Sequence, residues 1–151
     1  MFNLDLKDKV ILITGGSDGL GYASAELLSS EGAKVIICGR RGDYLNEKAK
    51  TISEKTNNNV LAIQADVSKA EDCKRLVEET ISKFKKIDIL VNNAGASAAA
   101  LFEDVSDKNW EDDINLKLMS TIRMCRLVIP YMKSNDKGVT INACLLYTSP
   151  S

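Results

Sequence analysis

Val10-Ile11-Leu12-Ile13-Thr14-Gly15-Gly16-Ser17-Asp18-Gly19-Leu20-Gly21 places a glycine-rich turn directly after a run of four apolar residues. A continuous apolar, β-branched run is typical of a strand buried on both faces, as in a parallel sheet. Glycines let the backbone approach a phosphate, and a helix that begins there presents free N–H groups and the positive end of its dipole. The stretch therefore predicts a strand, a phosphate-binding turn and a helix. The alternative is a tight strand-to-helix turn without a ligand, which also needs glycine.

Short apolar runs recur along the chain and alternate with stretches of helical periodicity. The runs Val35–Cys38, Val60–Ile63 and Ile87–Val91 begin at intervals of 25 to 27 residues. Between them, apolar residues repeat at helical spacing, most clearly as Cys73, Leu76, Val77, Thr80, Ile81 and Phe84. A helix marked by Leu20, Ala23, Leu27 and Leu28 should end at Gly32, and another should span 43–56. Repeated strand–helix–strand units predict the α/β class, a Rossmann-type doubly wound parallel sheet with helices on both faces.

The longest helix is expected over 106–133, with Ser106 or Asp107 as its N-cap. One apolar stripe on it consists of Ile114, Leu118, Ile122, Cys125, Ile129 and Met132, and further apolar surface of Leu116, Met119, Leu127 and Tyr131. A surface helix needs one such stripe, so the second predicts a subunit contact in a homo-oligomer. A helix deeply covered within one chain is an equal alternative. Gly138–Asn142 then predicts a fifth strand.

The composition excludes several classes of function. The 151 residues amount to one domain or part of one; 44% are hydrophobic, 27% are charged, and the formal net charge is −1. This balance predicts no nucleic-acid partner and no membrane surface as partner. Histidine is absent and the four cysteines form no C-x-x-C pair, so we expect no metal site. Widely spaced cysteines and an N-terminus without a signal peptide predict a cytoplasmic protein.

Three motifs at successive strand ends carry a family resemblance. Thr14-Gly15-x-x-x-Gly19-x-Gly21 differs in spacing from the common Gly-x-Gly-x-x-Gly, Asp66-Val67 follows the third strand, and Asn92-Asn93-Ala94-Gly95 follows the fourth. With Asn115 in the long helix, the pattern over 1–143 resembles the short-chain dehydrogenase/reductase family. The resemblance implies an NAD(P)(H)-dependent oxidoreductase that transfers hydride between nicotinamide and a small-molecule carbonyl or alcohol substrate. The alternative is a non-catalytic dinucleotide-binding sensor on the same fold.

The resemblance also implies which residues bind the cofactor. On the three motifs they are Gly15, Ser17, Gly19, Leu20, Gly21, Asp66, Val67, Asn92, Ala94 and Gly95. Asp66 would accept a hydrogen bond from the adenine amino group, and its alternative role is to cap the next helix. Asn115 would be catalytic by holding a water in the family's proton relay. Its alternative is a hydrogen-bonded polar residue inside a helix.

The choice of cofactor depends on the end of the second strand. In NAD enzymes an acid that binds the ribose stands about 20 residues beyond the glycine motif, but Gly39-Arg40-Arg41 occupies that place. The two guanidiniums of Arg40 and Arg41 suit a 2′-phosphate, so we expect NADP(H) to be preferred and NAD(H) to be possible. Asp18 opposes this preference, because its carboxylate could lie near the same phosphate.

The last residues depart from the family pattern. The resemblance implies a Ser near 143–145 and then a Tyr with a Lys four residues later, but Tyr147 is followed at that spacing by Ser151. Residues 144–151 instead resemble translated sequencing-adapter DNA. We therefore expect 1–143 to be an incomplete NAD(P)-binding domain, truncated after the fifth strand, and 144–151 to be a non-native tail. The 151-residue chain, which lacks the catalytic Tyr and Lys, is expected to be inactive.

Overall fold

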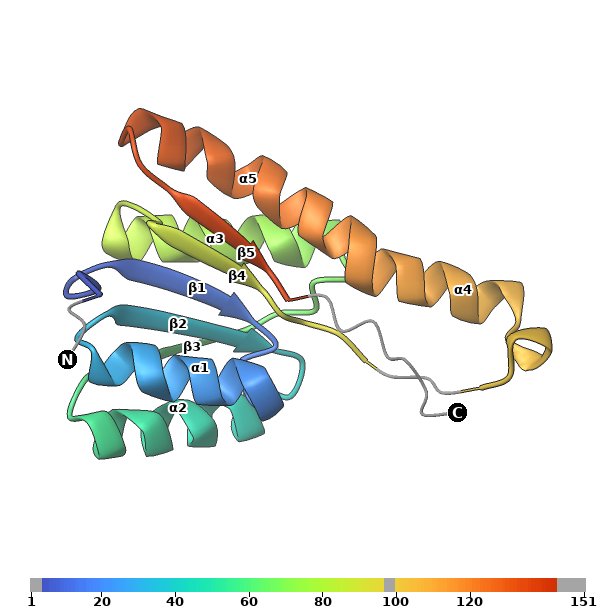
Figure 1. Cartoon of the computed structure of the whole chain (residues 1–151), viewed down its shortest axis with the longest axis horizontal. Coiled ribbons are helices and arrows are strands. Elements are labelled where there is room, and N and C mark those ends of the chain that lie inside the picture. Colours follow the sequence, from blue (N-terminus) through green and yellow to red (C-terminus); the bar gives the residue numbers. More distant parts are fainter. Residues whose placement is uncertain (1–3, 97–99, 144–151) are drawn as a thin grey trace.

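The computed structural model of the chain describes residues 4–96 and 100–143, and a five-stranded parallel sheet forms its centre (Figure 1). The strands are β1 (Val10–Thr14), β2 (Lys34–Gly39), β3 (Leu61–Gln64), β4 (Ile89–Asn92) and β5 (Val139–Asn142). Their order is β3-β2-β1-β4-β5, and Leu12 of β1 pairs with Ile36 on one side and Leu90 on the other. This order confirms the Rossmann-type sheet. The tail expected over 144–151 lies outside the described residues.

Helices cover both faces of the sheet. On one face lie α1 (Gly19–Ser30) and α2 (Gly42–Thr56), and on the other α3 (Ala70–Phe84) and α5 (Ser120–Ser134). Alternate residues of β1 enter the two cores: Ile11 packs with the α1 and α2 side, and Leu12 with the α3 and α5 side. All five residues of β1 are buried, which explains why the strand is a continuous apolar run.

The apolar stripe predicted for α3 is its buried face. Cys73, Leu76, Val77 and Thr80 are buried, and Ile81 and Phe84 pack against the same core. The helix predicted after the first strand is present as α1, and its buried face is made of small residues. The helix ends at Ser30, and Gly32, whose φ is +82°, lies in the turn that follows. Leu20 and Leu27 are exposed, and the buried residues are Gly21, Ala25 and Ser29. Of the large side chains of this helix, Leu28 and Tyr22 are partly buried and pack against the core.

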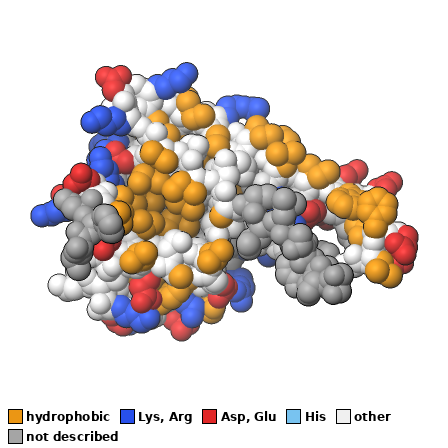
Figure 2. Space-filling view, in the orientation of Figure 1, with side chains coloured by type: hydrophobic (Ala, Val, Ile, Leu, Met, Phe, Trp, Pro, Cys, Tyr) orange, Lys and Arg blue, Asp and Glu red, His pale blue; other side chains and the backbone are white. Residues whose placement is uncertain are grey.

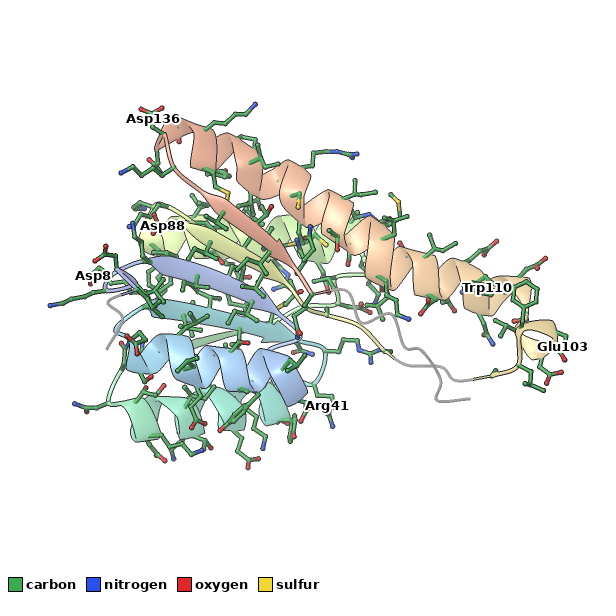
Figure 3. The ribbon with its side chains drawn as sticks, in the orientation of Figure 1. Asp8, Arg41, Asp88, Glu103, Trp110 and Asp136 are labelled. Atoms are coloured by element: carbon green, nitrogen blue, oxygen red, sulfur yellow. The ribbon has the colours of Figure 1, made fainter. Side chains whose placement is uncertain are left out.

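The long helix predicted over 106–133 is present and contains a π-helical turn. Helix α4 (Asp107–Ile114) runs into this turn, η2 (Asn115–Met119), and then into α5. Ser106 is the N-cap, because its Oγ accepts a hydrogen bond from the Asn109 N–H at 3.2 Å. Helix α4 and the short 3-10 helix η1 (Phe102–Asp104) project beyond the sheet, with Trp110 against Phe102 at the tip (Figures 1 and 3).

The buried face of α5 is a correction to the expected one. Ser120, Met124, Val128 and Met132 are buried, with Met124, Val128 and Met132 in the core shared with α3. Of the stripe expected to be the main one, Ile114, Leu118, Ile122 and Ile129 are exposed, between 36% and 55%. The helix therefore has two apolar sides, and the position of α3 and β4 decides which one is covered.

Three further features concern the described residues: whether cysteines pair, whether any group could hold a metal ion, and whether any helix could span a membrane. Cys38 and Cys73 are buried and free, as expected for small apolar side chains, and burial raises the pKa of the Cys38 thiol to about 12. Within 4–96 and 100–143, no group of three or more His, Cys, Asp or Glu is arranged to hold a metal ion. In the same two stretches, no helix has the length and hydropathy needed to cross a membrane.

Candidate functional site

A cavity of about 540 Å³ lies where the chain leaves the carboxyl ends of β1 to β4. Open α/β sheets bind ligands at this edge, where the strand order changes direction between β1 and β4. The volume lies within the range of about 300–1,000 Å³ that is usual for small-molecule sites. The predicted site residues that line it are Gly15, Ser17, Gly19, Leu20, Arg40, Arg41, Asp66, Val67, Ala94 and Gly95.

Some predicted residues lie outside the cavity, and several lining residues were not predicted. Gly21, Asn92 and Asn115 do not line it. The additional lining residues are Asp18, Cys38, Gly39, Ala65, Asn93 and Leu116. Gly39 ends β2 and precedes the predicted Arg40, and Ala65 follows β3 and precedes the predicted Asp66. Their positions at the ends of parallel strands would have pointed to them. Leu116 comes from the π-helical turn, for which the sequence gave no signal.

The turn between β1 and α1 leaves the start of the helix free to bind an anion. Gly15 and Gly19 have φ of +66° and +54°, which favour glycine. The first N–H of α1 to be paired is that of Tyr22, which donates to the Asp18 carbonyl at 3.1 Å. Within the described chain, the preceding N–H groups of Gly19 to Gly21 carry no hydrogen bond. Free N–H groups and the helix dipole together suit a phosphate.

Gly21 supports the turn from inside and does not line the cavity. A Cβ atom there would lie 2.1 Å from the Gly15 carbonyl oxygen and 2.5 Å from Asn93 Nδ2. Asn93 Nδ2 itself donates to the carbonyl oxygens of Thr14 and Gly15, at 3.2 and 3.0 Å. Thr14 Oγ1 in turn accepts from the N–H groups of Asn93 and Ala94, both at 3.0 Å. The glycine turn and the turn after β4 are therefore locked together.

Asn92 braces the sheet, while its neighbour Asn93 faces the cavity. Asn92 Nδ2 donates to Asn142 Oδ1 at 2.9 Å, and the two residues are register partners in β4 and β5. Asn92 is buried, and its Oδ1 has no donor among the residues that the structure describes. The amide that holds the glycine turn thus belongs to Asn93.

Asp66 has one oxygen committed to its own loop. Its Oδ1 accepts from the N–H and the hydroxyl of Ser68, at 3.1 and 2.7 Å. The N-cap of α3 is Lys69, so Asp66 is not the residue that caps this helix. The Asp66 N–H donates to Asp72 Oδ2 at 2.8 Å, and this bond is the main cause that lowers the pKa of Asp72. The second Asp66 oxygen has no hydrogen bond in the described chain, and the residue lines the cavity.

Asn115 lies in the π-helical turn, and both its Nδ2 and its Oδ1 form hydrogen bonds. Its Nδ2 donates to the Ser68 carbonyl oxygen at 2.9 Å, and its Oδ1 accepts from Arg123 Nη1 at 2.6 Å. Arg123 also donates to the Ser68 carbonyl oxygen, at 3.0 Å. The Asn115 side chain thus joins the long helix to the loop after β3. Its part in a proton relay stays a prediction.

The two arginines after β2 differ in their partners. Arg41 Nη2 lies 2.8 Å from Asp18 Oδ2, and its guanidinium stacks 4.1 Å from the centre of the Tyr44 ring. Figure 3 shows Arg41 at the end of the sheet toward which the strands point. The guanidinium of Arg40 carries no hydrogen bond or ion pair in the described chain. From the sequence, the Asp18 carboxylate was expected to oppose binding of a 2′-phosphate near the two arginines. In the structure it forms an ion pair with Arg41.

Tyr44 was missed by sequence reasoning. Its hydroxyl donates to Asp18 Oδ1 at 2.5 Å. Tyr44 and Lys48 have the Tyr-x-x-x-Lys spacing, but they stand on α2, and Lys48 Nζ lies 4.9 Å from the centre of the Tyr44 ring. The resemblance implies a Tyr and Lys beyond β5, so this pair at the other end of the site does not supply them.

Comparison with known proteins finds similar sequences and similar solved structures. The chain is 34% identical over 139 residues to "11-beta-hydroxysteroid dehydrogenase A" from Sesamum indicum, which covers 91% of this chain and 40% of that relative. The solved L-sorbose reductase from Gluconobacter frateurii, complexed with NADPH and L-sorbose, has 34% identity and a TM-score of 0.88 over 92% of this chain and 53% of its own. An NADH-dependent reductase responsible for alginate metabolism has 29% identity and a TM-score of 0.81, over 92% and 58%.

The chain spans about half the length of these relatives. The family model described as short chain dehydrogenase matches residues 9–148, which is most of the sequence. The matched stretch includes the glycine turn, the Asp66 loop, the turn after β4 and the π-helical turn. The chain therefore belongs to the short-chain dehydrogenase family.

Proposed function

We propose that the chain is the dinucleotide-binding part of an oxidoreductase that transfers hydride between a nicotinamide cofactor and a carbonyl or alcohol group. The observation that carries this proposal is the cavity at the carboxyl ends of β1 to β4, bordered by the unpaired N–H groups at the start of α1. A phosphate fits that position because N–H groups and the helix dipole both favour an anion. A Cβ at Gly21 would overlap the Gly15 carbonyl oxygen, so a glycine at this position lets the chain form the turn that borders the cavity.

The residues around the cavity divide the work of holding a dinucleotide. Gly15, Ser17, Gly19 and Leu20 would hold the phosphates, and the open oxygen of Asp66 would accept a hydrogen bond from the adenine. Arg40, whose guanidinium has no partner in the described chain, would bind a 2′-phosphate. We therefore propose that NADP(H) is preferred over NAD(H). Of the solved relatives, the L-sorbose reductase is complexed with NADPH and the reductase of alginate metabolism is NADH-dependent. When bound, the nicotinamide ring supplies or accepts the hydride.

The proton-transferring groups are proposed to lie beyond β5. A Ser that polarises the substrate oxygen and a Tyr with a Lys four residues later would complete the site. The substrate is a small carbonyl or alcohol compound, and the intact enzyme is proposed to be a homo-oligomer. The 151-residue chain would then bind cofactor without turnover. A non-catalytic sensor is the second candidate, and a downstream Tyr-x-x-x-Lys in the source gene would decide for the enzyme.

Calorimetric titration of the 151-residue chain with NADPH, and separately with NADH, tests the binding function. We expect both to bind, with a dissociation constant for NADPH about tenfold lower, because one guanidinium gains a phosphate partner. Gly21→Val should abolish both, since its Cβ alone overlaps the Gly15 carbonyl. Equal affinities would overturn the NADP(H) preference, and the absence of binding would overturn the proposed function.

A further inference from the structure

Asp18 is the N-cap of α1, but its side chain does not cap the helix. An Asp at this position ordinarily accepts a hydrogen bond from the second or third N–H of the helix. Here the carboxylate makes no such bond and reaches the start of α2 instead. Its Oδ2 accepts from Arg41 Nη2 at 2.8 Å and faces Ser17 Oγ at 3.4 Å, and its Oδ1 accepts from the Tyr44 hydroxyl at 2.5 Å.

This arrangement fixes Arg41 from two directions. The Tyr44 ring lies under its guanidinium at 4.1 Å, and the Asp18 carboxylate occupies one edge of the guanidinium fork. Arg41 and Asp18 both line the cavity, next to Arg40. Among the residues that the structure describes, the Arg40 guanidinium is therefore unpaired, whereas the Arg41 guanidinium is already paired with the Asp18 carboxylate.

We propose that Asp18 is a specificity-determining residue that weakens the preference for a 2′-phosphorylated cofactor by occupying Arg41. The proposal rests on the proposed function, because it concerns the same nucleotide site. A 2′-phosphate must displace the Asp18 carboxylate to use Arg41, and until then it meets a like charge. A ribose with a free 2′-hydroxyl has no need of Arg41. Asp18 thus reduces the advantage that the two arginines give to NADP(H).

The test uses two adenosine ligands that differ by one phosphate. Adenosine 2′,5′-bisphosphate and adenosine 5′-monophosphate are titrated by calorimetry into the 151-residue chain, and the ratio of their dissociation constants measures the 2′-phosphate alone. Asp18→Asn should increase the ratio in favour of the bisphosphate by about fivefold. In the Asp18→Asn background, Arg41→Met should remove this gain. Asp43→Asn, which removes an exposed carboxylate from the first turn of α2, is the matched control and should change the ratio less than twofold.

Each outcome has a distinct meaning. An unchanged ratio in Asp18→Asn, while both ligands bind, would overturn the role of Asp18 and leave the nucleotide site intact. A gain that persists after Arg41→Met, or an equal gain from Asp43→Asn, would show a general charge effect and would also overturn it. If neither ligand binds the unaltered chain, the proposed function itself fails and this inference fails with it.

Discussion

The hydroxyl of Thr14 joins two turns of the site, and its loss should cost more than a typical hydrogen bond. Thr14 is 2% exposed, and its Oγ1 accepts two backbone N–H groups, those of Asn93 and Ala94. Thr14→Val keeps the shape but leaves both N–H groups without an acceptor. We expect the free energy of unfolding to fall by about 2–4 kcal/mol, measured by urea titration with circular dichroism. Thr14→Ser keeps the hydroxyl and should cost less than about 1 kcal/mol; equal losses would refute this role.

Single residues of the site were predictable where their chemistry is local. The glycines follow from the backbone conformation of a tight turn, and Arg40 and Arg41 from their position after a strand. The pairing of Asp18 with Tyr44 was not predictable, because it joins residues 26 apart through the direction in which α2 begins. The same holds for Asn93, whose amide reaches the Gly15 carbonyl across 78 residues. Spacing locates motifs, but it does not show which side chains meet.

At the level of elements, Gly19 and Gly21 both stand in the first turn of α1, and each is needed there for a different physical reason. Gly19 has φ +54° with open space around a Cβ, whereas a Cβ on Gly21 would lie 2.1 Å from the Gly15 carbonyl oxygen. Gly19→Ala should therefore cost about 1 kcal/mol of stability through its backbone conformation. Gly21→Ala should cost about 3 kcal/mol, because the strand-to-helix turn must move. Urea unfolding of both variants measures the difference, and a larger loss in Gly19→Ala would contradict the packing seen here.

The two apolar sides of the long helix make a second matched pair. Met124 faces the core and is fully buried, whereas Leu118 is 55% exposed. We expect Met124→Ala to lower the free energy of unfolding by about 2–4 kcal/mol and Leu118→Ala by less than about 1 kcal/mol. The two are compared in the same urea titration. Similar losses would mean that the side of the helix expected from the sequence is covered after all.

That helix shows why periodicity alone predicts an element better than its orientation. A stripe at helical spacing was enough to predict α3 correctly, because this helix has one apolar side. The long helix has two, and most of the longer stripe, including Ile122 and Ile129, proved to be exposed, whereas its member Met132 is buried. Only the position of α3 and β4 determines which side is buried, and that position is a property of the tertiary fold.

At the scale of the whole molecule, the sheet was predictable because few topologies satisfy repeated strand–helix–strand units. The order β3-β2-β1-β4-β5 brings together strand ends that carry the glycine turn, Arg40, Asp66 and Asn93, far apart in the sequence. The cover of the sheet is uneven. Figure 2 shows hydrophobic side chains gathered over the part of the sheet between α1 and α5.

The edge strand β5 should govern association of the 151-residue chain. Val139 and Ile141 are 53% and 49% exposed, and among the described strands β5 pairs with β4 alone. An exposed apolar edge offers unpaired backbone groups and apolar side chains to a second copy. Ile141→Lys should therefore reduce light scattering at tens of micromolar protein, since charge at an edge opposes pairing. Leu27→Lys, at an exposed apolar position on α1, is the control. An equal reduction by both would assign the association to general surface hydrophobicity, because Leu27 lies on a helix and has no strand edge beside it.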